Sequence, residues 1–216
     1  MKKTLSYLFP FTQKIQSEYS GIVEITWSNG RKVLDSAHTN YSYGSLQRIL
    51  KFGLKQIDLK KSRNALLLGL GGGSVIKTLR DEFNFIKKIT AIEIDPVLID
   101  LAANEFDIKT SEQLDIINED ASEFVQTTSE TFDLIIVDLF IDNQVPEVFY
   151  LTEFWANITR ITSTNGYVIF NASVSQPSHN LLSNLTIFLK KSFSIELFTK
   201  VEGTNTILIA HKLIVQ

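Results

Sequence analysis

Hydrophobic and polar residues alternate over short distances near the amino terminus of the chain. Residues 21–28 and 31–36 carry this pattern on either side of Asn29-Gly30, a dipeptide typical of tight hairpin turns. Together the two stretches predict a β-hairpin. We therefore expect a small amino-terminal β region, which we assign to residues 1–42.

The hydrophobic pattern changes at about residue 64, from where apolar runs alternate with segments of helical period. A run that is apolar at every position is typical of a parallel strand buried on both faces, and alternating strands and helices predict a doubly wound sheet. The expected strands span residues 64–70, 87–94, 114–119, 132–140, 167–172, 194–200 and 205–213. The expected helices, the first of which precedes the first strand, span residues 43–57, 74–83, 95–106, 121–126, 147–161 and 178–193.

The last two expected strands are joined only by a short turn at Glu202-Gly203. This connection is too short for a crossover helix, so the two strands must pair antiparallel. The fold class predicted for residues 43–216 is accordingly α/β: a doubly wound, seven-stranded sheet that is mostly parallel and ends with an antiparallel carboxyl-terminal strand. A parallel sheet that ends in this way differs from the usual dinucleotide-binding fold.

Composition narrows the functional classes. The chain of 216 residues has no cysteine, which excludes thiol catalysis, thiolate metal sites and disulfides. Its three histidines show no metal-ligand spacing, and we expect no metal site. The net charge of −3 is spread along the chain, so a nucleic-acid partner is not favoured. Because Ser6 and Pro10 interrupt the first apolar stretch, and no apolar run reaches the ~20 residues of a membrane span, we expect a cytoplasmic protein without a membrane partner.

Small and acidic residues follow the first four expected strands, at the edge where open α/β sheets bind ligands. The first strand runs into the loop Gly69-Leu70-Gly71-Gly72-Gly73-Ser74, which carries almost no side chains. Four strand ends of this kind predict a cleft. The acidic residues that follow the next three strands are, in chain order, Glu93 and Asp95, Glu119 and Asp120, and Asp138 and Asp142.

The chemistry of these strand ends suits a nucleoside. A bare loop before a helix lets a ligand approach the backbone, a carboxylate after the second strand can accept ribose hydroxyls, and one after the third can accept an adenine amino group. Structural interpretations stand beside these. The glycines also fit a tight strand-to-helix turn, Asp95 and Asp120 also fit helix caps, and Asp138 also fits a brace for the next loop.

A family resemblance is carried by four stretches: "LLLGLGGGS", "AIEIDPVLIDLA", "INEDASEF" and "FDLIIVDLF". Together they resemble the spermidine synthase-like branch of the S-adenosylmethionine-dependent methyltransferase fold, from about Tyr19 to Phe170. The resemblance implies a Rossmann-like methyltransferase fold, with S-adenosylmethionine or its decarboxylated form as cofactor and a small-molecule acceptor. It also implies a homodimer formed through the amino-terminal region.

The resemblance also implies roles for individual residues. Glu93 matches the glutamate that holds the ribose hydroxyls, and Asp120 with Ala121 matches the pair that recognises adenine. Asp138 matches the first aspartate of the catalytic loop, and Tyr43 matches a tyrosine near the polyamine. The expected cofactor-binding residues are thus Gly69, Gly71, Gly72, Gly73, Glu93, Asp120 and Ala121, and the expected catalytic residues are Asp138, Asp142 and Tyr43.

Three departures from the family pattern affect the polyamine side. Gly72 stands where spermidine synthases have an aspartate, Asp142 lies one residue beyond their second catalytic aspartate, and Tyr43 is followed by glycine and serine rather than an acidic residue. The adenosine-binding groups are kept. Methyl transfer to an unidentified acceptor is therefore the preferred hypothesis, because it needs mainly proximity and in-line alignment.

Three alternatives stay open on the sequence. The first is an aminopropyltransferase that uses decarboxylated S-adenosylmethionine and a polyamine, with Asp142 as the base. The second is a non-catalytic nucleoside-binding or dimeric interaction protein. The third is a nicotinamide dehydrogenase, because the glycine loop nearly fits G-x-G-x-x-G, although the expected antiparallel carboxyl-terminal pair argues against it.

Overall fold

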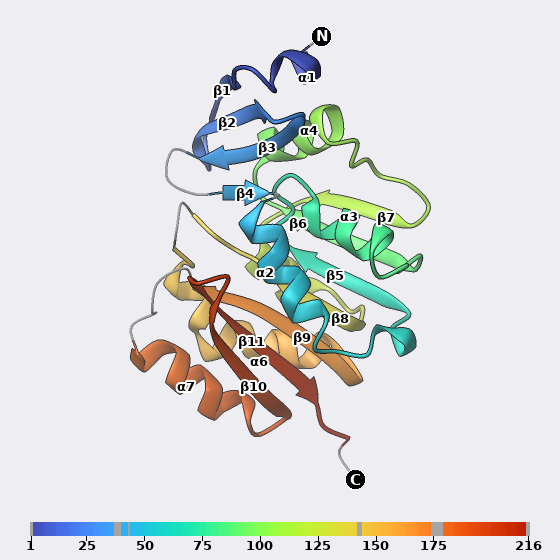
Figure 1. Cartoon of the computed structure of the whole chain (residues 1–216). Helices are drawn as coiled ribbons and strands as arrows, with labels where there is room; N and C mark the ends of the chain where they lie inside the picture. Colours follow the sequence, from blue (N-terminus) through green and yellow to red (C-terminus); the bar gives the residue numbers. More distant parts are fainter. Residues whose placement is uncertain (1, 37–39, 43, 142–143, 174–178, 215–216) are drawn as a thin grey trace.

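The computed structural model describes residues 2–36, 40–42, 44–141, 144–173 and 179–214, and it contains two sheets. Figure 1 shows the smaller sheet near the amino terminus and the larger sheet toward the carboxyl terminus. The smaller sheet follows the short helix α1 (Lys2–Leu5) and has the order β1-β2-β3-β4, with neighbouring strands antiparallel. Its strands are β1 (Phe11–Ser17), β2 (Gly21–Ser28), β3 (Arg31–Ser36) and β4 (Asn40–Ser42).

The predicted hairpin is confirmed as β2 and β3. Asn29 and Gly30 both have positive φ, 49° and 72°, as a two-residue hairpin turn with the twist of the strands requires. The hairpin is extended by β1 on one side and β4 on the other, which the hydrophobic pattern did not predict. Most of β1 is exposed, so it carries no alternating apolar face from which a strand could be recognised.

The larger sheet has the order β10-β11-β9-β8-β5-β6-β7. Its strands β5 to β9 are parallel, and β11 runs antiparallel to both β9 and β10, as predicted for the carboxyl-terminal pair. The predicted fold class is therefore confirmed, with a four-stranded sheet in place of a single amino-terminal hairpin. The strands are β5 (Asn64–Leu68), β6 (Lys88–Glu93), β7 (Leu114–Asn118), β8 (Phe132–Val137), β9 (Thr162–Ser173), β10 (Phe193–Val201) and β11 (Asn205–Lys212).

Helices cover both faces of the larger sheet (Figure 1). Successive side chains of a strand point to opposite faces. On β5, Ala65 and Leu67 therefore pack toward α2, α3 and α4, while Leu66 and Leu68 pack toward α5, α6 and α7. This double burial explains the run that is apolar at every position. The helices are α2 (Ser45–Leu54), α3 (Ser74–Asp81), α4 (Pro96–Glu105), α5 (Ala121–Thr127), α6 (Thr152–Ile161) and α7 (His179–Leu189), with 3-10 turns η1 (Leu59–Lys61) and η2 (Glu147–Tyr150).

The segment after β8 differs most from its prediction. The strand expected to reach residue 140 ends at Val137, and the helix expected over 147–161 is divided into η2 and α6. In addition, β9 begins at Thr162, five residues before the expected start. The turn signal that suggested this boundary lies inside the strand instead, where Asn165 has a φ of 63° and the pairing with β8 shifts register.

Two contacts attach the smaller sheet to the ends of α4. At the first end, the hydroxyls of Ser17 and Ser20 both donate to Asp95 Oδ2, at 2.6 and 2.5 Å. At the last turn, Lys32 Nζ donates to Glu105 Oε2 at 2.6 Å. The β1–β2 turn is thereby held against the edge of the larger sheet where the central strands end.

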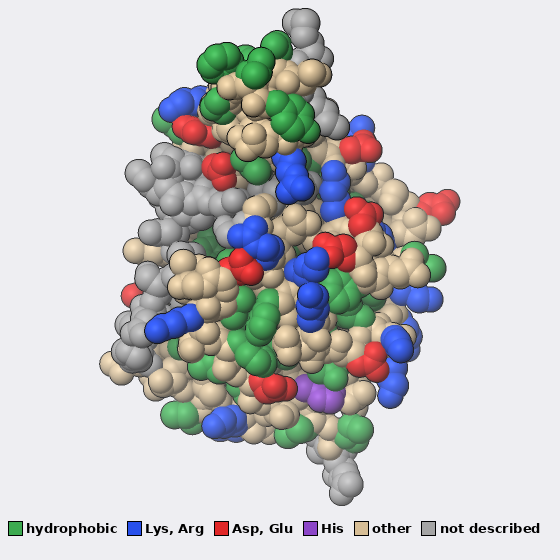
Figure 2. All heavy atoms as spheres, in the orientation of Figure 1, with side chains coloured by type: hydrophobic (Ala, Val, Ile, Leu, Met, Phe, Trp, Pro, Cys, Tyr) green, Lys and Arg blue, Asp and Glu red, His purple; other side chains and the backbone are tan. Residues whose placement is uncertain are grey.

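Apolar side chains are exposed at the amino-terminal end of the molecule, where Figure 2 shows them gathered. Exposed apolar patches of this kind are typical of protein–protein contacts. This patch is the candidate interface of the expected homodimer, which stays a prediction. Among the described residues, none of the helices is long and apolar enough to span a membrane. The exposed large apolar residues in the first eleven positions, among the described residues, are Leu5, Tyr7, Leu8, Phe9 and Phe11.

Candidate active site

A cavity of about 400 Å³ lies at the carboxyl ends of the central strands, and we call it the pocket. The prediction of a cleft at this edge is confirmed, because residues that follow β5, β6, β7 and β8 all line it. Four carboxylates are in its wall, and no basic residue is among its described lining residues. Such a pocket favours a cationic ligand. The predicted residues that line it are Gly69, Gly71, Glu93, Glu119, Asp120, Ala121 and Asp138.

Other predicted residues are not placed in the pocket wall. Gly72 and Gly73 belong to the loop but are not among the lining residues. A Cβ on Gly73 would lie 2.6 Å from the side chain of Ile108, and its φ is +74°, so packing and backbone geometry account for this glycine. Tyr43 and Asp142 lie outside the described residues.

The glycine loop turns toward a buried glutamate. The backbone N–H groups of Leu70 and Gly71 donate to Glu93 Oε2 at 3.0 and 3.1 Å. Gly69, with a φ of +93°, passes so close to the end of β8 that a Cβ would lie 2.2 Å from the carbonyl oxygen of Asp138. The loop is thus both a tight turn and part of the pocket wall.

Glu93 is 7% exposed, and three backbone N–H groups bind its carboxylate. The third donor is Asp95 N, 3.1 Å from Oε1. Burial raises the pKa of Glu93, and these three hydrogen bonds oppose that rise. Because a carboxylate offers about four acceptor positions, the bonds within the protein leave about one for a ligand hydroxyl.

Asp120 serves as a helix cap and also faces the pocket. Its Oδ1 accepts hydrogen bonds from the backbone N–H groups of Ser122 and Glu123, at 2.7 and 3.2 Å, at the start of α5. Its Oδ2 has no partner among the described residues and is available to a ligand amino group. The two interpretations of Asp120 are therefore compatible, because they use different oxygens.

Asp95, by contrast, is bound within the protein through both of its carboxylate oxygens. Its Oδ1 accepts a hydrogen bond from Val97 N at 2.9 Å and caps α4, as one of the two interpretations predicted. Its Oδ2 binds the hydroxyls of Ser17 and Ser20. The residue is 1% exposed and does not line the pocket. Its carboxylate holds the smaller sheet in place beside the pocket, where Ser20 and Tyr19 contribute to the wall.

Asp138 stands at the end of β8, half-buried, with one oxygen bound within the protein. Asn171 Nδ2 donates to its Oδ1 at 2.9 Å. The pKa of Asp138 is raised to about 6, mainly by burial and to a smaller extent by the nearby charge of Glu93, while the hydrogen bond from Asn171 opposes the rise. A carboxyl with this pKa can hold or release a proton near neutral pH.

Two buried asparagines of the pocket wall were not predicted from the sequence. Asn171, near the end of β9, is 0% exposed, and Asn205, the first residue of β11, is 2% exposed. Asn205 Nδ2 donates to Asn171 Oδ1 at 2.8 Å. Asn171 could have been found from the sequence, because it is a polar residue at the carboxyl end of an apolar strand. This is the criterion that identified the candidate residues after the first four strands.

Apart from Thr204, the rest of the pocket wall is apolar. Leu46 and Ile49 come from α2, and the segment after β8 contributes further side chains. A ligand in this pocket would therefore meet both carboxylates and hydrocarbon. The further apolar lining residues after β8 are Leu139, Phe140, Ile141, Pro146 and Phe149.

Curated proteins similar to this chain include polyamine aminopropyltransferases. A polyamine aminopropyltransferase from Sulfolobus acidocaldarius is 31% identical over 137 residues, which are 58% of this chain and 43% of the relative. One from Sulfurisphaera tokodaii is 28% identical over 116 residues, covering 49% of this chain and 37% of the relative. The chain thus spans less than half the length of these curated relatives.

Solved structures share the fold. A probable spermidine synthase from Corynebacterium glutamicum superposes with a TM-score of 0.78 at 18% identity, over 93% of this chain and 80% of that one. Human methyltransferase-like protein 13, solved in complex with SAH, superposes with a TM-score of 0.67 at 21% identity, over 81% of this chain and 84% of that one. The spermine/spermidine synthase domain model matches residues 48–202, more than half of the chain. The protein therefore belongs to the spermine/spermidine synthase family.

Proposed function

We propose that the protein is an aminopropyltransferase, which binds decarboxylated S-adenosylmethionine in the pocket and transfers its aminopropyl group to an amine. The observation that carries the proposal is the pocket itself, which has four carboxylates and no basic residue among the described residues of its wall. Both substrates of such a reaction are cations. Family membership and the aminopropyltransferase relatives support the same reaction.

The described residues fit the adenosine part of the donor. Asp120 Oδ2 is available for the adenine amino group, and Glu93 keeps about one acceptor position for a ribose hydroxyl. Ala121 begins α5, and the first N–H groups of a helix have no partner within the helix. The sulfonium group of the donor supplies an electrophilic carbon. The acidic wall favours this positive charge over neutral competitors.

Asp138 is the residue we assign to the reacting end. The acceptor nitrogen forms a bond to the donor carbon, the carbon–sulfur bond breaks with its electron pair going to sulfur, and one proton leaves the nitrogen. A carboxylate with a pKa of about 6 binds the cationic amine and can take that proton. Tyr43 and Asp142 stay proposals as further residues on the acceptor side.

Methyl transfer, the preferred hypothesis from the sequence, gains no support from the comparisons. The methyltransferase likeness is at 21% identity and shows the fold alone. The features that favour it are the three departures from the family pattern: Gly72 in place of the donor-binding aspartate, the displaced Asp142, and the glycine and serine after Tyr43. Methyl and aminopropyl transfer use related donors, so a direct assay must separate them.

The deciding experiment combines donor binding with product analysis. Thermal shifts are measured with decarboxylated S-adenosylmethionine, S-adenosylmethionine, methylthioadenosine and NAD. Occupancy at ~100 times the dissociation constant adds ~2.7 kcal/mol of stability, and we expect this for the decarboxylated donor and methylthioadenosine but not for NAD. Incubation of the decarboxylated donor with putrescine should yield spermidine and methylthioadenosine. Binding of S-adenosylmethionine alone, with no polyamine product, would overturn the proposal.

A further inference from the structure

A chain of hydrogen bonds crosses three adjacent strands and ends on Asp138. Thr204 Oγ1 donates to Asn205 Oδ1 at 2.7 Å, and Asn205 Nδ2 donates to Asn171 Oδ1 at 2.8 Å. Asn171 Nδ2 then donates to Asp138 Oδ1 at 2.9 Å. The four residues belong to β11 and the turn before it, to β9 and to the end of β8, and all four line the pocket. Every donor in the chain points toward the carboxylate.

We propose that Asn171 and Asn205 are positioning residues that fix Asp138 Oδ1 as an acceptor and leave Oδ2 as the oxygen that meets the ligand. The reaction that this serves is the one given under Proposed function, on which the proposal rests. No described residue donates to or accepts from Asp138 Oδ2.

The direction of the chain follows from the chemistry of its members. An ionised carboxylate only accepts, so Asn171 must present its amino group to Asp138 and its oxygen to Asn205. Asn205 must then present its own amino group, and its oxygen accepts the hydroxyl proton of Thr204. With Asn171 and Asn205 buried, reversing either amide would place like groups against each other without water to separate them.

The charges around Asp138 explain why its neighbours on β9 and β11 are uncharged amides rather than basic residues. Among the described residues of the pocket, the charged groups are Glu93 at the end of β6 and Glu119 with Asp120 after β7. All of these are negative. From β9 and β11, on the other side of Asp138, come uncharged amides and a hydroxyl. A lysine or arginine there would also favour the ionised carboxylate, but it would repel a cationic ligand. The amides stabilise the carboxylate without adding a positive charge.

The test is a titration of Asp138, followed by carboxyl carbon NMR in the full chain without ligand. In Asn171→Leu we expect the pKa of Asp138 to rise by about one unit, because a hydrogen bond to the ionised form is lost. In Asn205→Leu we expect a smaller rise, because the amide of Asn171 is no longer held. Asn157→Leu, which removes a bond from Asn157 to the backbone oxygen of Glu153 on α6, should leave the titration unchanged.

A second variant covers the case in which leucine prevents folding. Asn171→Asp keeps the shape but places a second carboxyl against Asp138, and we expect the pair to titrate in two separated steps. In an active enzyme, the acidic limb of the kcat/KM profile should move to higher pH with Asn171→Leu, in step with the NMR titration. A purely structural role would lower activity without moving this limb.

An unchanged titration of Asp138 in folded Asn171→Leu, or a single unshifted step in Asn171→Asp, overturns the proposal. The NMR result needs no substrate, so it stands apart from the proposed function. Failure of that function is seen in the wild-type protein instead, as an absence of donor binding and of product.

Discussion

The Cβ atom that Gly69 lacks would lie 2.2 Å from the carbonyl oxygen of Asp138. The close approach arises because Gly69 N donates to Ile92 O while Asp138 N donates to Leu68 O, both at 2.9 Å, where three strands end together. The first glycine of the loop is therefore required by the packing of β5 against β8. The same contact fixes the backbone position of Asp138 and therefore the point at which its carboxyl group enters the pocket.

Gly69→Ala should destabilise the protein far more than another glycine substitution at positive φ. The added methyl group meets backbone, which cannot move aside without shifting β8, so we expect a loss of more than about 3 kcal/mol. Gly203→Ala is the matched control, because Gly203 has a φ of +84° with no atom within 4 Å of the added Cβ. It should cost about 1–2 kcal/mol. Urea unfolding measures both, and equal losses would show that backbone strain alone explains Gly69.

Asp120→Asn should separate the two roles of this residue. Asparagine caps a helix about as well as aspartate, so the free energy of unfolding should change by less than about 0.5 kcal/mol. Its amide can no longer offer a carboxylate oxygen to an adenine amino group, and we expect methylthioadenosine to bind roughly 10–100 times more weakly.

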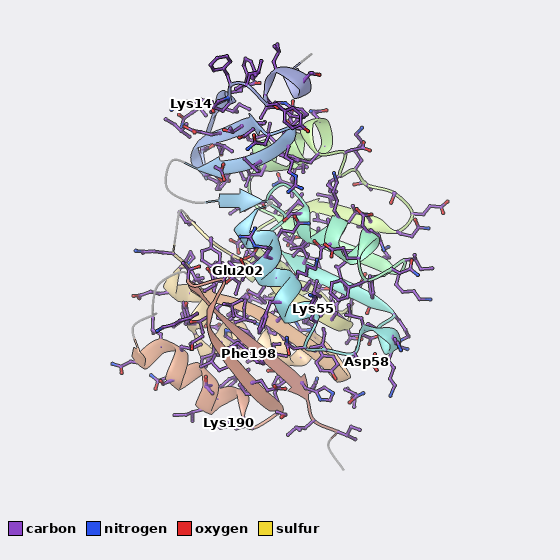
Figure 3. The ribbon with its side chains drawn as sticks, viewed as in Figure 1. Lys14, Lys55, Asp58, Lys190, Phe198 and Glu202 are labelled. Atoms are coloured by element: carbon purple, nitrogen blue, oxygen red, sulfur yellow. The ribbon has the colours of Figure 1, made fainter. Side chains whose placement is uncertain are left out.

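Calorimetry with methylthioadenosine and with its inosine analogue tests the adenine contact of Asp120. Wild-type protein should prefer the adenine compound, and Asp120→Asn should lose most of that preference. Asp58→Asn provides the control, because Asp58 caps η1 away from the pocket and is labelled in Figure 3. An unchanged preference in Asp120→Asn would assign Asp120 to capping alone.

Asp138→Asn should stabilise the protein at pH 8 but not at pH 4. The pKa of Asp138 is about 6 in the fold, above the ordinary value of 3.8, so folding disfavours its ionised form. The protonated form of Asp138 contributes its full stability to the fold below about pH 4. This contribution decreases as the pH rises from about 4 to about 6, and it is lost above about pH 6. Removing the charge should therefore add roughly 1–3 kcal/mol at pH 8. Urea unfolding at both pH values measures this, and a gain that is equal at both would contradict the shifted pKa.

Glu93→Gln should weaken both the fold and the binding of the donor. Glutamine would direct an amino group at backbone N–H groups that now donate to Glu93, so we expect a loss of about 1–3 kcal/mol. Glu119→Gln is the matched control, since Glu119 also lines the pocket but its carboxylate accepts no hydrogen bond from the described residues. In Glu119→Gln the free energy of unfolding should change by less than about 0.5 kcal/mol. Similar losses in the two variants would refute the structural role of Glu93.

The sequence predicted best what depends on neighbouring residues along the chain. β5 and β8 were recognised because burial on both faces makes every position apolar, and Glu93, Asp120 and Asp138 were found because parallel strands end at one edge. The strand β1 was missed because it is mostly exposed and leaves no hydrophobic period. The division at residue 42 stays a prediction.

Asn171 and Asn205 could not be recognised as a pair from sequence alone. They lie 34 residues apart, and their contact exists only because β11 pairs with β9. Neither side chain ionises, so neither stands out in a search for acids and bases. The role of a buried amide can be assigned only when its hydrogen-bond partners are known.

The β10–β11 hairpin is tied to the neighbouring helix as well as to the pocket. Phe198 meets the ring of Phe52 of α2 edge-on, with 5.2 Å between ring centroids, and Arg48 pairs with Glu202 at 2.6 Å. Phe198 and Glu202 are labelled on this hairpin, beside α2, in Figure 3. The helix that supplies Leu46 and Ile49 to the pocket thus also anchors the turn that carries Thr204.

The position of β11 between β9 and β10 has a consequence for how the protein is made. Synthesis delivers Glu93, Asp120 and Asp138 early, but Asn205 emerges from the ribosome only after every other strand of the sheet. A nascent chain that stops before β11 has the acidic residues without the amide that orients Asn171. We expect ligand recognition at the proposed site to require the insertion of β11 between its two neighbours, after the other strands of the sheet have been synthesised.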